Sequence, residues 1–338
     1  IVKLSALGDI VHCLPAVAQI RNRYPSAQID WLIERKNSDI VKMSRLSVNL
    51  IPIDISTWRK NPDVNALTEL MQFVRKLRAA KYDCAIDFQG LIKSALLTRL
   101  SGAPLRIGFS WKAIKEPLAT LFYTERVTPK QVHIVNQLRE ILLPLGIQPN
   151  EKTVSLFASE AAHQIVWNKL DHLSGYVLIN PGGNWPTKRW HPERFLALAQ
   201  QIVKKGIPVV ITAAPAEEEV LHTITRRTAE KGIYNIVTTL EELVALCAGA
   251  RLFVGGDTGP LHMATAMGIP TVALFGPTHS QRNGPLSKDD VVVERSLPCR
   301  PCYKRERCPL GHWKCMEEIS VEEVYNACIK RLFTQDQG

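Results

Sequence analysis

The sequence predicts an α/β protein with two domains, each containing a parallel β-sheet. Short apolar strand patterns alternate with helix patterns along most of the chain, which is typical of βαβ units. A polar segment at residues 146–152 interrupts this alternation, and 338 residues are enough for two domains of ordinary size. We therefore expect a first domain over residues 1–150, a second over 151–318 and a last segment over 319–338.

Each domain is expected to follow the same order of strand and helix. In the first, a strand end at residues 2–4 leads through a turn into a helix, and the later elements continue the alternation: helices at 10–24, 67–80 and 91–100, and strands at 29–33, 84–88 and 106–109. The second domain repeats the pattern: strands at 176–180, 208–212, 252–254 and 271–275 and around Ile236, and helices at 195–205, 217–231, 240–248, 261–267 and 321–333. Ligands of open parallel sheets bind beyond the carboxyl ends of the strands. We therefore expect both sheets to face a cleft between the domains.

The composition is that of a soluble globular protein, with 46% hydrophobic and 22% charged residues. No stretch approaches the ~18 uncharged apolar residues that span a bilayer, and no secretory signal pattern is found, so we expect a cytoplasmic protein. The net charge of +10 indicates an acidic partner, such as nucleic acid, an anionic membrane surface or a phosphorylated substrate. Nucleic acid is not expected, because no helix-turn-helix, RNA-recognition or OB signature is present.

The most informative stretch, residues 254–278, reads as strand, glycine-rich turn, helix and strand. Such a turn directs free backbone N–H groups and the positive end of a helix toward one point, which suits a phosphate or diphosphate. A lone histidine early in a helix is usually structural, and only its place in this helix favours a role in binding. The binding candidates in this turn are Asp257, Thr258, Gly259 and His262.

A second glycine-containing loop follows the strand expected at 176–180 and contains Gly183, Asn184, Lys188 and Arg189. Glycine permits close approach of the backbone to a ligand, and the two cations could neutralise a departing diphosphate without a metal. The alternative interpretation is a solvated basic loop. We favour a function in binding, because the loop follows the carboxyl end of a strand.

Asp9 falls at the start of the first expected helix. An acid at this position can be a cap or a first-turn residue favoured by the helix dipole. It can equally be a general base that faces a ligand. The sequence leaves both interpretations open.

The segment Trp58-Arg59-Lys60 places an aromatic residue beside two cations in an expected loop. This combination suits a sugar acid or a phosphate. The alternative is that the basic residues of this region form a solvated surface with apolar stems.

Four cysteines crowd near the end of the second domain, with His312 among them: Cys299, Cys302, Cys308 and Cys315. Their spacing resembles that of metal ligands, so a structural zinc is one interpretation. Disulfides and free thiols remain alternatives. We expect the group to be structural, because a closed thiolate site leaves no open coordination position for catalysis.

Several separated motifs resemble glycosyltransferase family 9, the heptosyltransferases of lipopolysaccharide core assembly, and especially its type I members. They occur in order over nearly the whole chain: residues 3–16, 58–60, 87–95, 116–123, 188–190 and 256–262. The cysteine group departs from type I and is more similar to type II members. Gly183-Asn184 also stands where type I members have hydroxyl residues near the phosphates.

The resemblance implies a GT-B fold of two Rossmann-like domains, with the acceptor bound by the first and the ADP-sugar by the second. It implies inverting, metal-independent transfer of L-glycero-D-manno-heptose from ADP-heptose to a Kdo residue of the lipid A core, without a cofactor. The enzyme would be peripheral, on the inner face of the inner membrane. A different sugar or acceptor is one alternative, and a GT-B-shaped epimerase or hydrolase of nucleotide sugars is another.

The resemblance also implies roles for individual residues. Asp9 would deprotonate the acceptor hydroxyl, and Lys188, with backbone N–H groups at 257–259, would hold the diphosphate. Glu217 would bind the ribose, with Glu218 and Glu219 as alternatives. The acceptor would be met by Arg59, Lys60 and Lys93, and the last helix would return to brace the first domain.

Overall fold

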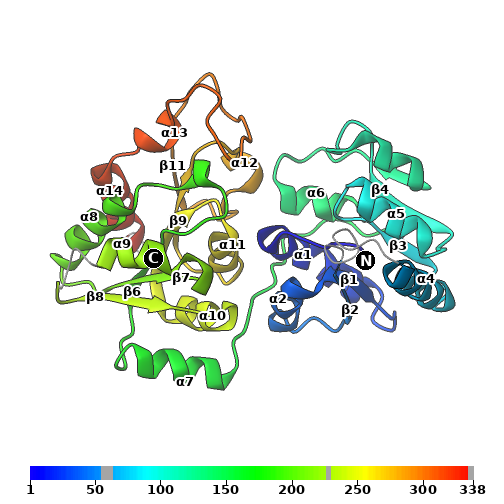
Figure 1. Cartoon of the computed structure of the whole chain (residues 1–338), viewed down its shortest axis with the longest axis horizontal. Coiled ribbons are helices and arrows are strands. Elements are labelled where there is room, and N and C mark those ends of the chain that lie inside the picture. Colours follow the sequence, from blue (N-terminus) through cyan, green and yellow to red (C-terminus); the bar gives the residue numbers. More distant parts are fainter. Residues whose placement is uncertain (55–63, 226–229, 334–338) are drawn as a thin grey trace. The chain divides into compact units, whose positions relative to one another are not determined.

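The chain forms two compact units, Ile1–Val154 and Ser155–Gly338. The computed structural model describes residues 1–54, 64–225 and 230–333 (Figure 1). The division falls four residues after the boundary expected at residue 150. Among the described residues, no helix has both the length and the apolar character needed to cross a membrane.

The first unit is built on parallel strands around residues 1–4. Val2 forms parallel bridges to Leu32 on one side and to Asp87 on the other, so the start of the chain joins two small sheets. The strands pair in the orders β1-β2 and β3-β4-β5. Their bounds are β1 Asp30–Glu34, β2 Asn49–Ile53, β3 Cys84–Ile86, β4 Leu105–Phe109 and β5 Glu125–Val127.

The helices of the first unit begin with α1, which packs against α2 and α6. Their bounds are α1 Leu7–Arg23, α2 Ser38–Met43, α4 Val64–Ala79, α5 Ile92–Leu100 and α6 Ile134–Glu140, with short 3-10 turns η1 Arg35–Asn37, η2 Pro117–Phe122 and η3 Leu143–Leu145. The helix expected to begin near residue 10 therefore begins at Leu7, which places Asp9 in its first turn.

The second unit is one six-stranded sheet in which every pairing is parallel. Its order, β8-β7-β6-β9-β10-β11, is that of a Rossmann sheet, and the chain reverses direction across the sheet between β6 and β9. The central strands are buried on both faces, which explains their unbroken apolar sequences. The strand bounds are β6 Tyr176–Asn180, β7 Val209–Ala213, β8 Ile233–Val237, β9 Ala250–Gly256, β10 Thr271–Phe275 and β11 Val291–Glu294.

Helices flank this sheet in the second unit (Figure 1). Their bounds are α7 Glu160–Lys169, α8 Pro192–Val203, α9 Glu218–Thr225, α10 Leu240–Gly249, α11 Gly259–Ala266, α12 Ser280–Asn283, α13 Lys314–Glu317 and α14 Val321–Phe333, with 3-10 turns η4 Pro186–Lys188 and η5 Pro215–Glu217.

The C-terminal helix α14 packs within the second unit, and the expectation that residues 319–338 form a segment bracing the first domain stays a prediction. The reason for the packing of α14 lies in its apolar face, because Val324, Cys328 and Leu332 are buried in the core of the second unit. Arg331 adds a buried ion pair to Asp290, with 3.1 Å between Nε and Oδ1.

Candidate functional site

Two loops of the second unit meet where the strand order of its sheet reverses. One follows β6 and ends in η4, and the other joins β9 to α11. Their backbones approach closely, because a Cβ on Gly256 would lie 3.2 Å from the main-chain oxygen of Lys188. A Cβ on Gly183 would lie 3.0 Å from Cγ2 of Thr258. Glycine at both positions lets the loops touch, at the place where Rossmann sheets bind ligands.

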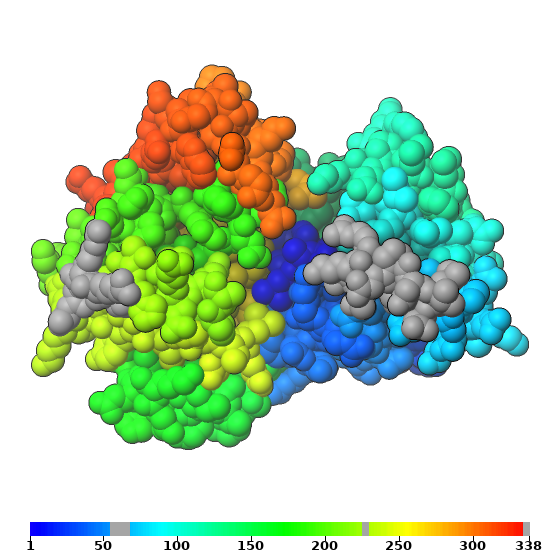
Figure 2. All heavy atoms as spheres, viewed as in Figure 1, coloured from blue at the N-terminus to red at the C-terminus, as the bar shows by residue number. Residues whose placement is uncertain are grey.

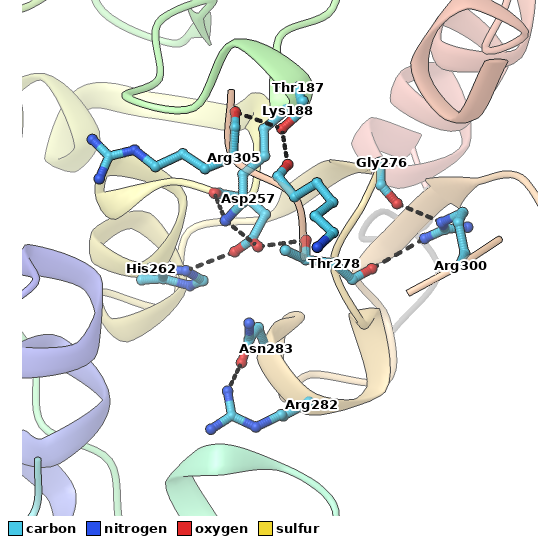
Figure 3. A network of polar contacts seen from close by, with 11 residues as sticks. Thr187, Lys188, Asp257, His262, Gly276, Thr278, Arg282, Asn283, Arg300 and Arg305 are labelled. Carbon is cyan, nitrogen blue, oxygen red and sulfur yellow. Dashed lines mark hydrogen bonds and ion pairs between the residues drawn. The ribbon is translucent and has the colours of Figure 1, made fainter. Parts of the chain in front are cut away.

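Asp257 is the centre of the polar network in these loops (Figure 3). Its carboxylate is buried, and Lys188 donates to Oδ2 at 2.7 Å and to the main-chain oxygen at 3.0 Å. Thr278, which follows β10, donates to the same Oδ2 at 2.6 Å. Nε2 of His262 lies 3.1 Å from Oδ1. Three separate segments are thus tied to one carboxylate.

The surroundings of Asp257 keep its carboxylate ionised. Burial alone would raise the pKa of Asp257, but His262 and then Lys188 outweigh burial and hold that pKa well below its usual range. The carboxylate is therefore an anchor for its neighbours and not a proton acceptor near neutral pH. Lys188 has three N–H donors and uses two of them on Asp257, so with respect to the described residues one donor remains for a ligand. Its Nζ also lies 4.4 Å from the centre of the Trp185 ring.

The N-terminus of α11 adds further groups that suit an anion. Pro260 lies in the first turn, where its missing N–H costs little, and the helix dipole is positive at this end. Thr258 is the N-cap residue, and its Oγ1 is buried without a hydrogen-bond partner among the described residues. A buried hydroxyl of this kind is ready to bond a ligand oxygen. Together with Lys188, these groups can bind a phosphate.

Glu217 holds the glycine loop after β6. Its Oε1 accepts a hydrogen bond of 2.7 Å from the N–H of Gly183, and a Cβ on Gly182 would lie only 2.2 Å from Oε2. Glu217 is half-buried, whereas Glu218 and Glu219 are exposed. The structure therefore brings Glu217 to the loop and leaves its two neighbours outside it.

Other residues of the same loop lie around Gly183. Nε of Arg189 donates to the main-chain oxygen of Gly183 at 2.7 Å, so both backbone polar groups of this glycine are engaged within the protein. Asn184 is exposed beside it. The loop is thus fixed on both sides, with Asn184 as its accessible side chain.

Asp9 lies in the first unit at the start of α1, and its carboxylate is half-buried. Oδ2 accepts a 3.1 Å hydrogen bond from the N–H of Ala6, so the expected capping role is present. Oδ1 accepts no hydrogen bond from the residues that the structure describes, which leaves it available to a ligand. The capping and general-base interpretations are therefore compatible, because each uses a different oxygen.

A network that the sequence analysis did not assign holds the turn before Asp9. Oε1 of Gln89 accepts hydrogen bonds from the N–H groups of Leu4 at 3.0 Å and Ser5 at 3.2 Å. The loop that carries Gln89 is fixed in turn by Asp87, which is fully buried. Burial raises the pKa of Asp87, against the effect of its hydrogen bonds. Those bonds come from four groups: the Tyr123 hydroxyl, the Ser94 hydroxyl and the N–H groups of Gln89 and Gly90.

Of the three expected acceptor residues, the structure describes Lys93 only. Its ammonium lies 3.7 Å from Oε1 of Glu34, and its side chain is 41% exposed, so the pair is weak and Lys93 remains accessible. Arg59 and Lys60 lie outside the described residues.

The four cysteines Cys299, Cys302, Cys308 and Cys315 are free thiols. The suggested zinc is not supported, because no group of three or more His, Cys, Asp or Glu residues within 1–54, 64–225 and 230–333 could hold a metal ion. Main-chain N–H groups of residues 310–313 surround the Cys308 sulfur and, against the effect of burial, lower the pKa of this thiol. The groups around the Cys308 sulfur are therefore backbone N–H donors.

The segment that carries the cysteines braces the loop after β6 and the segment after β10, and no signal in the sequence indicated this role. It appears in orange at the surface of the second unit in Figure 2. Its main-chain oxygens at Lys304 and Arg305 accept hydrogen bonds of 2.7 and 3.1 Å from Thr187, the residue before Lys188. Arg300 donates to the main-chain oxygens of Gly276 and Thr278. The position of Thr278 just after a strand was the available signal for its role.

Comparisons with known proteins agree on one family. The model for "Glycosyltransferase family 9 (heptosyltransferase)" matches residues 70–314. Lipopolysaccharide heptosyltransferase 1 of Pseudomonas aeruginosa is 31% identical over 308 residues, covering 90% of this chain and 86% of the relative.

Solved structures agree with this match. The structure of Escherichia coli heptosyltransferase WaaC with ADP has a TM-score of 0.76 and 27% identity, covering 98% of each chain. The same enzyme with ADP-2-deoxy-2-fluoro heptose has a TM-score of 0.72 and 28% identity, covering 100% of this chain and 98% of that one. These matches establish the GT-B fold of this chain.

Proposed function

Because the chain belongs to glycosyltransferase family 9, the heptosyltransferases, we propose that it transfers L-glycero-D-manno-heptose from ADP-heptose to a Kdo residue of the lipopolysaccharide inner core. The observation that carries this proposal is Lys188 fixed on Asp257 beside the N-terminus of α11. It combines a cation, a helix end and a free hydroxyl where a nucleotide diphosphate would bind. The WaaC structures were solved with ADP and with ADP-2-deoxy-2-fluoro heptose, which supports the same donor here.

The proposed donor site uses the residues of the second unit. Lys188 and the α11 N-terminus would bind the diphosphate, with the hydroxyl of Thr258 on a phosphate oxygen. Glu217 would meet the ribose, close to Gly183 and Asn184. As the sugar leaves, negative charge grows on the diphosphate, and fixed donors that are already in place stabilise that charge without rearranging. Neutralisation by these groups would make the transfer independent of a metal.

The proposed reaction is a direct displacement at the anomeric carbon. Oδ1 of Asp9 would take the proton of the Kdo hydroxyl while the hydroxyl oxygen forms a bond to that carbon. The bond between the carbon and the diphosphate oxygen breaks, and ADP leaves with the electron pair. One displacement inverts the configuration of the sugar.

The acceptor is proposed to bind the first unit through basic residues, namely Arg59, Lys60 and Lys93. Kdo carries a carboxylate, so cations suit it. Since the acceptor is a lipid, we propose that the enzyme works at the cytoplasmic face of the inner membrane without spanning it. No nucleic-acid partner is proposed.

A donor screen tests the function. ADP-, UDP- and GDP-linked sugars would be offered with a Kdo-bearing lipid A acceptor, and products would be identified by mass spectrometry. We expect transfer from ADP-heptose and none without acceptor. Free sugar or an isomerised nucleotide sugar formed in the absence of acceptor would contradict the proposal and favour a hydrolase or an epimerase.

A further inference from the structure

The first unit carries an exposed apolar surface that the proposed reaction does not use. It is formed by α5 and by residues 110–122, which include η2 and are coloured cyan to turquoise in Figure 2. Five large side chains are exposed there and are called the apolar patch: Ile92 (40%), Leu96 (44%), Trp111 (58%), Leu118 (57%) and Leu121 (70%). Grouped apolar side chains of this kind mark interaction sites.

The two segments form one surface because they pack on each other. The N–H of Ile92 donates to Oε2 of Glu116 at 2.7 Å, which ties the start of α5 to the start of η2. Ala95 of α5 and Ala119 of η2 are both fully buried in a small cluster with Tyr123. The inner sides of both helices are therefore occupied by this cluster.

The exposed sides of α5 and η2 carry the apolar patch. Leu118 and Leu121 are three residues apart in a 3-10 helix, in which such positions lie one above the other. Ile92 and Leu96 are four apart on α5 and share one helix face. Trp111 lies in the loop that leads from β4 to η2.

The exposed charged residues within the two patch segments are all basic. Within 92–100 and 110–122, which are described throughout, the exposed charged residues are Lys93, Arg99, Lys112 and Lys115. The acid of these segments, Glu116, is half-buried and bonded to Ile92. A protein interface usually lacks lysine at its centre, whereas apolar side chains ringed by lysines and arginines suit an anionic lipid surface.

We propose that the apolar patch and three of these basic residues, Arg99, Lys112 and Lys115, dock the protein on an anionic phospholipid bilayer. The apolar side chains enter the boundary between headgroups and acyl chains, and the cations meet the lipid phosphates. The biological reason to meet a bilayer rests on the proposed function, because that acceptor is a lipid. Binding itself needs neither donor nor acceptor, so it is tested separately.

The test is co-sedimentation of the full chain with vesicles of phosphatidylcholine containing phosphatidylglycerol, or of phosphatidylcholine alone. We expect binding to the anionic vesicles only. The double variant Leu118→Ser/Leu121→Ser should bind at least about tenfold more weakly, because two large side chains lose their burial in lipid. Its matched control is Leu286→Ser/Leu310→Ser, on leucines that are 44% and 60% exposed in the second unit. This control should bind like the unchanged protein.

The charge is tested with Lys112→Glu/Lys115→Glu, against the exposed pair Lys204→Glu/Lys205→Glu in the second unit. The first pair should weaken binding about tenfold or more, and added salt should reduce the difference. ADP titration by calorimetry should give the same affinity for all four variants, which shows that the second unit folds, and an unchanged thermal transition of the first unit shows that this unit folds in the two patch variants.

Equal vesicle binding by patch and control variants would overturn the proposal, and so would no binding to anionic vesicles. If the unchanged protein self-associates but does not bind vesicles, and the patch variants lose this self-association, the patch is a protein interface. That result would also overturn the proposal. A failure of heptose transfer with vesicle binding intact would count against the proposed function alone.

Discussion

Two aspartates show how the surroundings of a residue decide its chemistry. Asp257 is buried among Lys188, His262 and Thr278, and its pKa lies below the usual range, so it holds other groups in place. Asp9 is half-buried, and one of its oxygens caps α1 while the other accepts no bond from the described residues. Asp9 is therefore the better candidate for a base.

Replacing Asp9 by asparagine should separate catalysis from binding. The amide oxygen of Asp9→Asn can still accept the Ala6 N–H, so α1 should remain capped. Loss of the base should lower kcat about 10²- to 10⁴-fold. ADP affinity, measured by calorimetry, should stay unchanged. Turnover within threefold of the unchanged enzyme would remove Asp9 from this role.

Lys188→Ala should affect both donor binding and stability. It removes the cation proposed for the diphosphate and leaves the buried carboxylate of Asp257 without its ion-pair partner. We expect ADP to bind at least about tenfold more weakly and the free energy of unfolding to fall by about 3 kcal/mol. Calorimetry and urea unfolding measure the two effects.

The control for Lys188→Ala is Lys169→Ala. Lys169 pairs with Glu242 at 3.0 Å but is 43% exposed, so its loss should cost under about 1 kcal/mol and leave ADP binding intact. Unchanged ADP affinity in Lys188→Ala would show that the ammonium does not bind the diphosphate.

At the scale of elements, the loops that follow strands were predictable and the partners of distant segments were not. The turn at residues 254–260 can be identified from its sequence, because an apolar strand is followed by glycines and by a proline at a helix start. This pattern is typical of the loops that follow strands in parallel sheets. The start of α7 carries a sequence signal of its own, because the side chain of Ser159 caps the helix by accepting a hydrogen bond from the N–H of Ala162. The apolar face of α14 predicts burial, but its pattern does not say against which sheet.

The fold class and the family could be predicted from many short sequence patterns that occur in a fixed order. The two α/β units are present, and the family resemblance is confirmed by the model that matches residues 70–314. Contacts across long stretches of sequence were beyond such reasoning. Gln89 meets Leu4 and Ser5, 85 and 84 residues earlier, and nothing in a local pattern specifies that pairing.

Gln89 offers a test of this element-level arrangement. Gln89→Met has a similar length but no acceptor, so the N–H groups of Leu4 and Ser5 lose their partner and the turn before Asp9 should loosen. We expect kcat to fall about tenfold or more, since small misplacement of a reacting group is costly, with the KM for the donor unchanged. Gln89→Glu keeps an acceptor oxygen and should recover most of the activity. Equal losses in both variants would indicate a role other than positioning.

At the scale of the whole molecule, the two units should respond differently to acid. Asp257, Glu242 and Glu323 of the second unit have lowered pKa values, that of Glu323 at about 2. A lowered pKa stabilises the folded state in full above the unfolded pKa, near 4, and this contribution is lost progressively as the pH falls from about 5 toward the folded pKa. Asp290 has the opposite effect on the stability of the same unit in acid, because burial raises its pKa.

The first unit has a different balance of carboxylates. Desolvation raises the pKa of the buried Asp87, so its ionised form costs stability at neutral pH, and this cost disappears on protonation. The pKa of Asp30 is lowered: burial opposes this shift, but hydrogen bonds, the strongest from Tyr82, outweigh it. Protonation of Asp30 in acid removes its stabilising contribution, which offsets part of the stability gained when Asp87 is protonated. The net expectation is that the second unit loses more stability than the first between pH 6 and pH 3.

Differential scanning calorimetry over this pH range checks the expectation. We expect one unfolding transition for each unit, and the two transition temperatures should move apart as the pH falls. Asp257→Asn identifies the sensitive transition. Asparagine cannot titrate, so this variant should unfold earlier at pH 6 and show a smaller further decrease toward pH 3. If the variant keeps the full pH dependence of the sensitive transition, the ion cluster around Asp257 is not its source, and the acid response must come from Glu242 and Glu323 at the ends of α10 and α14.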